Sequence, residues 1–221
     1  MKKTKRLQTL CGELLPCVLF ADVGCDHGYM AQYMLENSLC ERAYISDISF
    51  ASLQKACTLL SDYILSGKIQ SFCCPGLEQI PRDAEQVLIA GMGGEEIIGI
   101  LRDGFFPPRL VLQPMKNTDK VRRYLLDSGY AIQRDYTFLD GKFYDVLCAV
   151  QGNETRRYDE LSLLFGYDNI HSPKEDFLKY LKEEEQKCRS RLAAAREEIP
   201  AVSKRLELLT EALHEAERNI R

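Results

Sequence analysis

The pattern of hydrophobic and polar positions in the first half of the chain predicts a parallel sheet with crossover helices. Short runs of β-branched and apolar residues alternate with longer segments whose apolar residues recur three and four positions apart. The predicted strands cover residues 18–23, 43–48, 69–73, 87–90 and 110–112. The predicted helices between them cover residues 29–35, 50–65 and 96–101. This order is typical of a doubly wound α/β fold.

The pattern changes after one further helix, for which Asn117, Thr118 and Asp119 are the expected caps. Two strand-like runs follow at residues 130–139 and 142–150, and the Asp140-Gly141 dipeptide between them suits a tight hairpin turn. Five parallel strands closed by an antiparallel hairpin form the Rossmann-like layout of class I methyltransferases. A dinucleotide-binding Rossmann domain would instead be expected to add a sixth parallel strand through another helix.

The composition becomes polar beyond Gln151, which predicts a separate helical region. The run from Ser172 to Glu175 predicts a capping box with proline at the first helical position. Apolar residues then follow one stripe to Ile199, and after Pro200 they recur at alternating spacings of four and three. We expect a Rossmann-like domain over residues 1–152 and an antiparallel, coiled-coil-like helical hairpin over residues 153–221. On the pattern alone, this hairpin is a structural arm without chemistry.

Composition excludes several classes of protein. With 221 residues, 45% of them hydrophobic, the chain can bury one full-sized core and a small second unit. The first apolar stretch is brief and is interrupted by Glu13 and Pro16, so we expect neither a signal peptide nor a membrane span. The nine scattered cysteines are expected to be reduced thiols of a cytoplasmic protein. The three histidines lack metal-ligand spacing, so no metal is expected.

The net charge of −4 argues against a protein that coats nucleic acid indiscriminately. Local basic faces are still compatible with this charge, because lysine and arginine residues cluster at three places. The clusters are Lys2, Lys3, Lys5 and Arg6; Lys116, Lys120, Arg122 and Arg123; and Arg156 with Arg157. Each cluster alone is also compatible with a solvated helix or loop face.

The most informative segment runs from Ala21 to Tyr29, where the first predicted strand meets the first helix. Asp22 is followed by Gly24 and Gly28, which allow the backbone to approach a ligand at a helix N-terminus. Asp26 occupies the position of the middle glycine of the usual triplet. A carboxylate there would repel a pyrophosphate, but it is compatible with a cofactor whose reactive centre is a sulfonium cation. A generic turn capped by Asp26 is the alternative.

Two further strand ends carry candidate ligand-binding residues. Asp47 ends the second predicted strand, where a carboxylate can accept both ribose hydroxyls of an adenosine moiety. The third strand leads into the turn at residues 74–77, where an adenine ring would lie. The fourth leads into Ala90-Gly91-Met92-Gly93-Gly94, whose small residues leave the backbone open to a flat ligand.

These motifs together are specific to one family. The chain resembles the bacterial TrmK family, the tRNA (adenine(22)-N(1))-methyltransferases, over nearly its whole length. The resemblance rests on Asp22–Tyr29, Ile89–Gly94, Leu112-Gln113-Pro114, Lys142 with Tyr144, and the helical C-terminus. It implies transfer of the methyl group of S-adenosylmethionine to ring nitrogen 1 of an adenine at position 22, in the D-loop of tRNA. The chain departs from many relatives at Met115, where they have asparagine, and at Pro75, where they have aspartate or asparagine.

The expected site residues fall into three groups. The cofactor would be bound by Arg6, Asp22, Gly24, Cys25, Asp26, Gly28, Asp47, Ile48, Gly76, Ala90, Gly91 and Met92. Catalysis would involve Asp26, which would stabilise positive charge on the methylated ring, His27, which would orient Asp26 or the substrate, and Gln113, which would hydrogen-bond the flipped adenine. The tRNA would be contacted by Tyr29, Pro114, Lys116, Lys120, Arg122, Arg123, Lys142 and Tyr144.

Other functions are left open by the sequence. One is a methyltransferase that acts on a small molecule or a protein, against which the helical hairpin and the basic clusters count. Another is a non-catalytic module that binds the cofactor and RNA, against which the intact Asp22, Gly24, Gly28 and Asp47 count. A nicotinamide-dependent reductase is opposed by Asp26 and by the closing hairpin. The oligomeric state is open, with a monomer expected.

Overall fold

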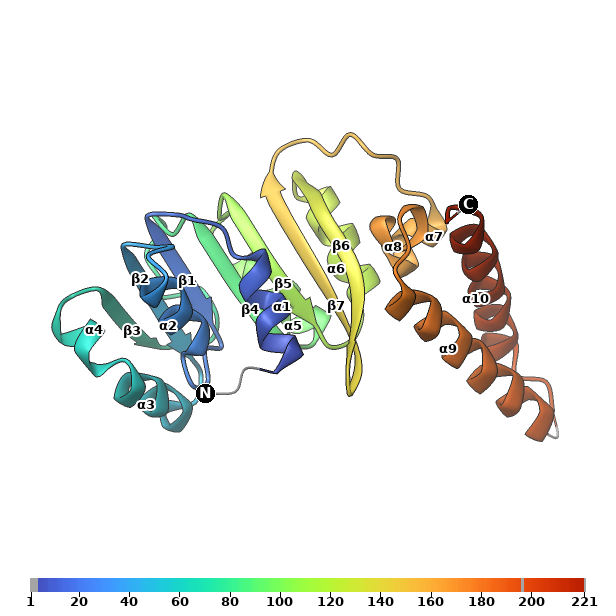
Figure 1. Cartoon of the computed structure of the whole chain (residues 1–221), viewed down its shortest axis with the longest axis horizontal. Coiled ribbons are helices and arrows are strands. Elements are labelled where there is room, and N and C mark those ends of the chain that lie inside the picture. The colour runs from blue at the N-terminus through green and yellow to red at the C-terminus, as the bar shows by residue number, and fades with distance from the viewer. Residues whose placement is uncertain (1–3, 196, 221) are drawn as a thin grey trace. The chain divides into compact units, whose positions relative to one another are not determined.

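The computed structural model describes residues 4–195 and 197–220, so Lys2 and Lys3 of the first basic cluster lie outside the described residues. Within this part of the chain, seven strands form one sheet in the order β3-β2-β1-β4-β5-β7-β6 (Figure 1). The strands are β1 (Leu19–Val23), β2 (Arg42–Asp47), β3 (Ile69–Cys73), β4 (Gln86–Met92), β5 (Arg109–Pro114), β6 (Tyr130–Asp140) and β7 (Lys142–Gln151).

The predicted fold class is confirmed. β1 pairs in parallel with β2 and β4, β2 pairs with β3, and β4 pairs with β5. β7 pairs antiparallel with β5, and β6 forms the edge of the sheet. β6 and β7 are joined at Gly141, whose φ of +72° explains the glycine in this turn. The sheet therefore has five parallel strands closed by a hairpin.

The crossover helices agree with the prediction except at one break. They are α2 (Tyr29–Glu36), α3 (Phe50–Leu59), α4 (Ser61–Leu65), α5 (Gly94–Asp103) and α6 (Thr118–Asp127). The single helix predicted over residues 50–65 is wrong, because the buried Leu60 leaves the helical conformation and separates α3 from α4. Asn117 precedes α6 in a left-handed conformation and does not cap it with its side chain.

The N-terminal helix α1 (Lys5–Glu13) was not predicted from the sequence. Thr4 caps it by accepting a hydrogen bond from the Leu7 backbone N–H at 3.2 Å. Leu10, Cys11 and Leu14 are buried beneath it. The first unit of the fold therefore includes an N-terminal helix whose apolar side is fixed in the core.

The chain divides into two compact units. The first comprises Met1–Gln133 and Val146–Thr155, and the second comprises Arg134–Asp145 and Arg156–Arg221. This division passes through the β6–β7 hairpin, whereas the boundary expected from the sequence follows residue 152. Among the described helices, none is both long enough and apolar enough to cross a membrane.

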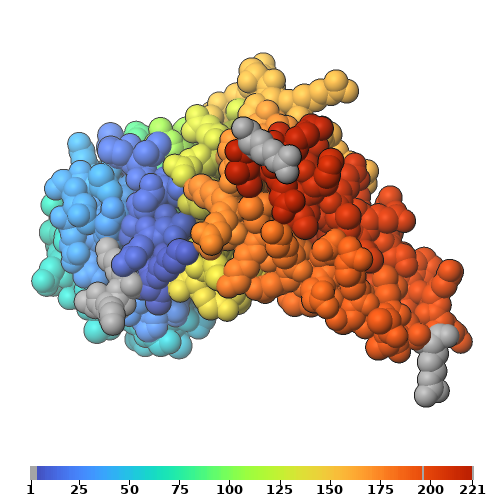
Figure 2. Space-filling model, turned by 45° about the vertical axis from the view of Figure 1, so that its right-hand side comes forward, coloured from blue at the N-terminus to red at the C-terminus, as the bar shows by residue number. Residues whose placement is uncertain are grey.

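The second unit contains the expected helical hairpin. Its helices are α7 (Glu160–Phe165), α8 (Tyr167–His171), α9 (Glu175–Ala194) and α10 (Pro200–Arg218). α9 and α10 pack side by side (Figures 1 and 2), and Pro200 is the first residue of α10. Their shared core contains Phe177, Leu181, Leu209, Ala212 and Ala216.

The capping box expected at Ser172 is wrong. Ser172 terminates α8, and its backbone N–H donates to the Asp168 carbonyl at 2.9 Å. The long helix α9 starts only at Glu175, and Lys174 precedes it without a side-chain cap. The chain here turns directly from one helix to the next, so Ser172 is used at the end of α8 instead of at the start of α9.

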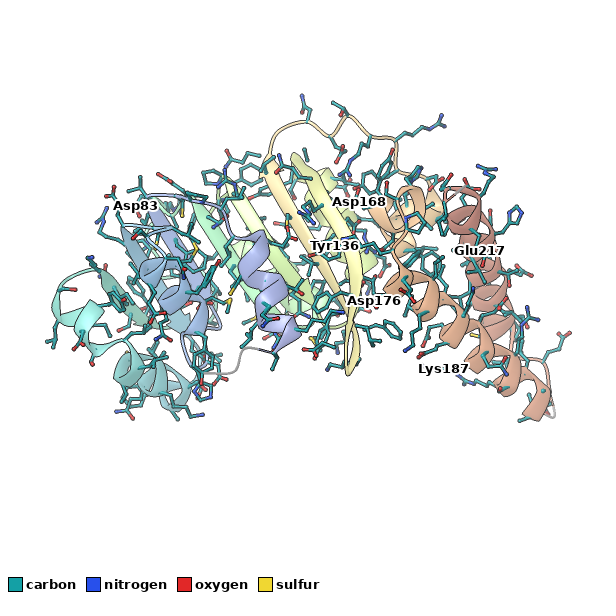
Figure 3. The ribbon with its side chains drawn as sticks, viewed as in Figure 1. Asp83, Tyr136, Asp168, Asp176, Lys187 and Glu217 are labelled. Atoms are coloured by element: carbon teal, nitrogen blue, oxygen red, sulfur yellow. The ribbon has the colours of Figure 1, made fainter. Side chains whose placement is uncertain are left out.

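The edge strand β6 is covered by side chains of the second unit. Alternate backbone N–H groups of β6 donate to α8 and α9: Asp135 to Asp168 Oδ2 at 2.8 Å, Thr137 to Asn169 Oδ1 at 2.9 Å, and Leu139 to Asp176 Oδ2 at 3.0 Å. Asp168 and Asp176 are seen beside β6 in Figure 3. An exposed sheet edge could pair with another chain, so these three acceptors protect it.

Candidate active site

The first unit contains a cavity of about 600 Å³ at the carboxyl ends of its central strands. Residues of the turn after β1, of the ends of β2 and β4, and of α1 line this cavity. Open α/β sheets bind ligands at this edge, next to the point where the strand order reverses. Here that point lies between β1 and β4.

The turn after β1 requires glycine at its first position. The backbone N–H groups of Gly24 and Cys25 donate to the Ser46 carbonyl at 2.8 and 2.9 Å, so the turn is tied to β2. Gly24 has a φ of +70°, and a Cβ atom there would lie 2.0 Å from Met92 Cε. Any other residue would push the turn away from β4 or displace Met92.

Asp47 at the end of β2 is held in place by two backbone donors. Its Oδ2 accepts from the Asp26 N–H at 3.1 Å and its Oδ1 accepts from the Ser49 N–H at 2.8 Å. Both atoms belong to a carboxylate that lines the cavity. A fixed carboxylate at this position can accept hydrogen bonds from the two hydroxyls of a ribose.

Asp26 presents its own carboxylate at the cavity and remains exposed. His27 Nε2 lies 3.6 Å from Asp26 Oδ2, and Lys55 Nζ lies 4.0 Å from Oδ1. The His27 ring stacks on Tyr29, with ring centroids 5.2 Å apart. Asp26, His27 and Tyr29 therefore form one group at the cavity.

Asp22 is the buried acid of the site. Its side chain lines the cavity, yet the residue is only 4% exposed, and its Oδ2 accepts from the Ala31 N–H at 3.4 Å. Burial raises the pKa of Asp22 to about 7, because the charged form loses its hydration. A cation placed in the cavity would favour the ionised carboxylate.

Arg6 reaches the cavity from the first turn of α1. Its Nε donates to Gln113 Oε1 at 2.6 Å. Gln113 lies at the end of β5, is fully buried, and is not among the residues that line the cavity. Gln113, which was expected to hydrogen-bond the substrate base, is thus hydrogen-bonded to Arg6 and does not line the cavity.

Most of the residues predicted to bind a cofactor come together here. Within the described part of the chain, eleven of the twelve line the cavity, and Gly28 is the exception. Gly28 precedes α2 as its N-cap with a φ of +72°, and a Cβ atom there would lie 2.7 Å from Leu60 and 3.1 Å from Ala56. The close approach of Gly28 to Ala56 and Leu60, together with its left-handed conformation, therefore explains this glycine.

The basic residues predicted to contact tRNA are in different environments. Lys116 and Arg123 are exposed, and Lys120 forms an ion pair with Glu95. Arg122 is only 1% exposed, because it lies on the face of α6 that packs into the core. The prediction that Arg122 binds the tRNA backbone is therefore wrong, since its guanidinium does not reach the surface.

The remaining predicted substrate-binding residues lie outside the cavity wall. Pro114 is buried at the end of β5. Lys142 and Tyr144 belong to the second compact unit, where Lys142 Nζ lies 5.2 Å from the centre of the Tyr144 ring. Tyr144 also stacks on Phe138, with centroids 5.4 Å apart.

Sequence reasoning missed the contribution of α1 beyond Arg6. Thr4, Leu7 and Leu10 line the cavity as well. The signal was present, because Leu7, Leu10, Cys11 and Leu14 recur at helical spacing behind a threonine cap. Glu96 and Ile100 of α5 line the cavity too, and nothing in the sequence pattern marked them.

The charged side chains that line the cavity fit S-adenosylmethionine. Asp47 would bind the ribose hydroxyls, Arg6 would pair with the carboxylate of the methionine moiety, and the acidic wall that includes Asp22 suits a sulfonium cation. Among the described residues, no group of three or more histidine, cysteine, aspartate or glutamate side chains could hold a metal ion.

Comparison with known proteins agrees with this chemistry. A family model described as a methyltransferase domain matches residues 3–147. The tRNA (adenine(22)-N(1))-methyltransferase of Bacillus subtilis is 33% identical over 172 residues, which cover 75% of this chain and 72% of that protein.

Solved structures of tRNA methyltransferases are also similar to this chain. The crystal structure of the B. subtilis m1A22 tRNA methyltransferase TrmK has a TM-score of 0.83 at 28% identity, covering 96% of this chain and 99% of that one. Streptococcus pneumoniae Sp1610 in complex with S-adenosyl-L-methionine has a TM-score of 0.85 at 25% identity, again with 96% and 99% coverage. The chain belongs to the TrmK family of S-adenosylmethionine-dependent tRNA (adenine(22)-N(1))-methyltransferases.

Proposed function

We propose that this chain methylates ring nitrogen 1 of adenine 22, in the D-loop of tRNA, with S-adenosylmethionine as methyl donor. The observation that supports the proposal most strongly is that Asp22, Asp26 and Asp47 all line one cavity of about 600 Å³. The chain that forms this cavity belongs to the TrmK family. The cofactor supplies an electrophilic methyl group on a sulfonium. The protein then needs mainly to hold donor and acceptor in line.

The cofactor would be oriented by several of the residues that line the cavity. Asp47 would accept the ribose hydroxyls, while Ile48 and Gly76 would contact the adenine ring. Arg6 would bind the carboxylate of the methionine moiety through charge-assisted hydrogen bonds. Gly24 carries no side chain, which leaves room for Met92 beside it at the cavity.

Asp26 would act on the substrate during methyl transfer. The lone pair of adenine nitrogen 1 forms the new bond to the methyl carbon as the carbon–sulfur bond breaks, and the sulfur leaves as a neutral thioether. The positive charge thereby moves onto the adenine ring, where the exposed Asp26 carboxylate would stabilise it. No general base is required, because nitrogen 1 of neutral adenine carries no proton.

The flipped adenine would stack on Tyr29, which already stacks on His27 at the cavity. Lys116, Lys120 and Arg123 would bind tRNA phosphates, which gives affinity that depends on salt but not on sequence. The second unit, with the hairpin of α9 and α10, would also bind the tRNA backbone. We expect the protein to act as a monomer in the cytoplasm, where its tRNA substrate is found.

The proposal is tested by incubating the purified chain with isotopically labelled S-adenosylmethionine and total bacterial tRNA, followed by nucleoside analysis. Label in N1-methyladenosine is the expected result. Label in another nucleoside would indicate a different acceptor atom. Cofactor binding without any transfer to tRNA would favour another acceptor molecule or a non-catalytic role.

A further inference from the structure

We infer that Gln113 is a positioning residue that fixes the Arg6 guanidinium for the cofactor and does not touch the adenine that is methylated. This inference rests on the proposed function, because it assigns a role within the same site. It replaces the direct interaction with the base that the position of Gln113 at the end of β5 first indicated.

The hydrogen bonds of Gln113 leave little of its amide for a substrate. Gln113 is fully buried, and its Oε1 accepts from Arg6 Nε at 2.6 Å. Its Nε2 lies 3.4 Å from Met115 Sδ, within the distance of a hydrogen bond to sulfur. A base would have to displace one of these neighbours to reach the amide.

Arg6 is the group in this site that most needs to be positioned. Among the described residues that line the cavity, it is the one lysine or arginine, whereas Asp22, Asp26, Asp47 and Glu96 are all acidic. A mobile guanidinium could turn towards any of these carboxylates. A hydrogen bond from Arg6 Nε to Gln113 favours one orientation of the guanidinium, in which the carboxylate of the cofactor would bind.

The surroundings of Arg6 anchor its backbone and leave room for its guanidinium. α1 is anchored by the buried Leu10 and Cys11, so the Arg6 backbone cannot shift freely. A Cβ atom at Gly91 would lie 2.9 Å from Arg6 Nη2, so the absence of a side chain there leaves room for the guanidinium. The hydrogen bond from Arg6 Nε to Gln113 Oε1 contributes to fixing the guanidinium within this space.

The test is a double-mutant cycle on the full-length chain, with S-adenosylhomocysteine as the binding probe in calorimetry. Gln113→Met keeps the side-chain volume and removes the hydrogen bonds, so we expect affinity to fall about tenfold, as for removal of a hydrogen bond to a charged group. In an Arg6→Ala background the same substitution should change affinity less than about twofold, because its target is gone.

Kinetics separate this role from a direct interaction with the base. With saturating cofactor, kcat of Gln113→Met should stay within about threefold of the original chain while KM for S-adenosylmethionine rises. Unchanged affinity for S-adenosylhomocysteine with a large loss of kcat would overturn the inference. Additive effects of the Arg6 and Gln113 substitutions on binding would also overturn it.

Gln86 provides a matched control. It is also a fully buried glutamine, and it exchanges two hydrogen bonds with the Leu15 backbone at the amino end of β4. Gln86→Met should leave the affinity for S-adenosylhomocysteine unchanged. If Gln113→Met does not fold, Gln113→Glu keeps an oxygen acceptor for Arg6 and should bind within about threefold of the original chain; a tenfold loss would contradict the inference.

Two different outcomes would contradict the proposed function and the positioning role of Gln113. A chain that binds no S-adenosylhomocysteine at all would contradict the proposed function and the inference with it. A chain that binds the probe and methylates tRNA, but in which the Gln113 and Arg6 substitutions act independently, would contradict the inference alone.

Discussion

The backbone N–H of Asp26 donates a hydrogen bond to Asp47 Oδ2 at 3.1 Å, which links the turn after β1 to the end of β2. Asp26 holds this position with a φ of +45°, in the left-handed region. The carboxylate assigned to the ribose thus also sets the position of the carboxylate assigned to the reacting base. Changes at the two residues should nevertheless affect different steps.

Asp26→Asn should abolish most turnover and leave the cofactor bound. Asparagine tolerates the left-handed conformation and keeps the backbone N–H that Asp47 accepts, so the turn should survive. We expect kcat to fall by roughly a hundredfold or more, and affinity for S-adenosylmethionine to stay within about tenfold. Single-turnover methylation and calorimetry measure the two quantities. Turnover near that of the original chain would exclude Asp26 from the chemistry.

Asp47→Ala should weaken cofactor binding by roughly ten- to hundredfold. The substitution removes the proposed ribose acceptor and also leaves the N–H groups of Asp26 and Ser49 without this partner. Calorimetric titration with S-adenosylhomocysteine measures the loss. Asp62→Ala, an exposed change in α4, is the control and should bind normally. Equal affinity of the two variants would mean that the ribose is bound elsewhere.

Asp22→Asn should alter how stability depends on pH. The pKa of Asp22 is raised from 3.8 to about 7, so the folded chain holds a proton that the unfolded chain releases between these values. The free energy of unfolding of the original chain therefore loses a contribution as pH rises from 3.8 to about 7. Asparagine cannot ionise, so the variant does not lose this contribution over the interval.

The measurement is urea unfolding of both proteins without cofactor at pH 5 and pH 8. We expect Asp22→Asn to gain stability relative to the original chain between the two pH values, because all other titrating groups are shared. A stability difference that does not change with pH would mean that Asp22 is ionised in the folded protein at both values.

Combined Lys116→Ala and Arg123→Ala substitutions should weaken tRNA binding and leave cofactor binding unchanged. Both side chains are exposed, and removal of each charge that pairs with a phosphate should reduce the slope of log affinity against log salt concentration by about one. Filter binding at several salt concentrations measures this slope. Lys68→Ala, just before the amino end of β3, is the matched control. If Lys68→Ala reduced the slope equally, the weaker tRNA binding would be due to net charge alone.

Asn169→Ala should destabilise the second unit. The buried Asn169 accepts from the Thr137 N–H at 2.9 Å and donates to Thr137 Oγ1 at 2.8 Å and to the Phe165 carbonyl at 2.7 Å. Removal of these bonds should cost roughly 2–4 kcal/mol of unfolding free energy. Asn153→Ala in an exposed loop is the control. Urea denaturation followed by circular dichroism should show a lower midpoint for Asn169→Ala alone.

The sheet was predictable because each strand carries its own local signal. β3 matches its predicted bounds, and the β6–β7 turn follows from Asp140 and Gly141. The errors fall where tertiary packing overrides local pattern. Nothing in the sequence shows that Leu60 interrupts a helix, because its departure from helical geometry accompanies complete burial of its side chain.

The cofactor residues were predictable for a similar reason. They lie in short motifs at strand ends, and parallel pairing brings Gly24, Asp47 and Gly91 to one edge. A basic cluster does not by itself show that Arg122 is buried, but helical spacing places Arg122 with Val121 and Leu125 on the buried face of α6. The role of Gln113 depends on Arg6, which is 107 residues away in the chain.

The proposed activity is tested most directly by methylation of two tRNA transcripts that differ only at nucleotide 22. Labelled S-adenosylmethionine, the purified chain and a transcript with adenine 22 should give one labelled N1-methyladenosine per tRNA. The transcript with guanine 22 should remain unlabelled. Equal labelling of both transcripts, or labelling of neither while the chain binds S-adenosylmethionine, would contradict the central claim.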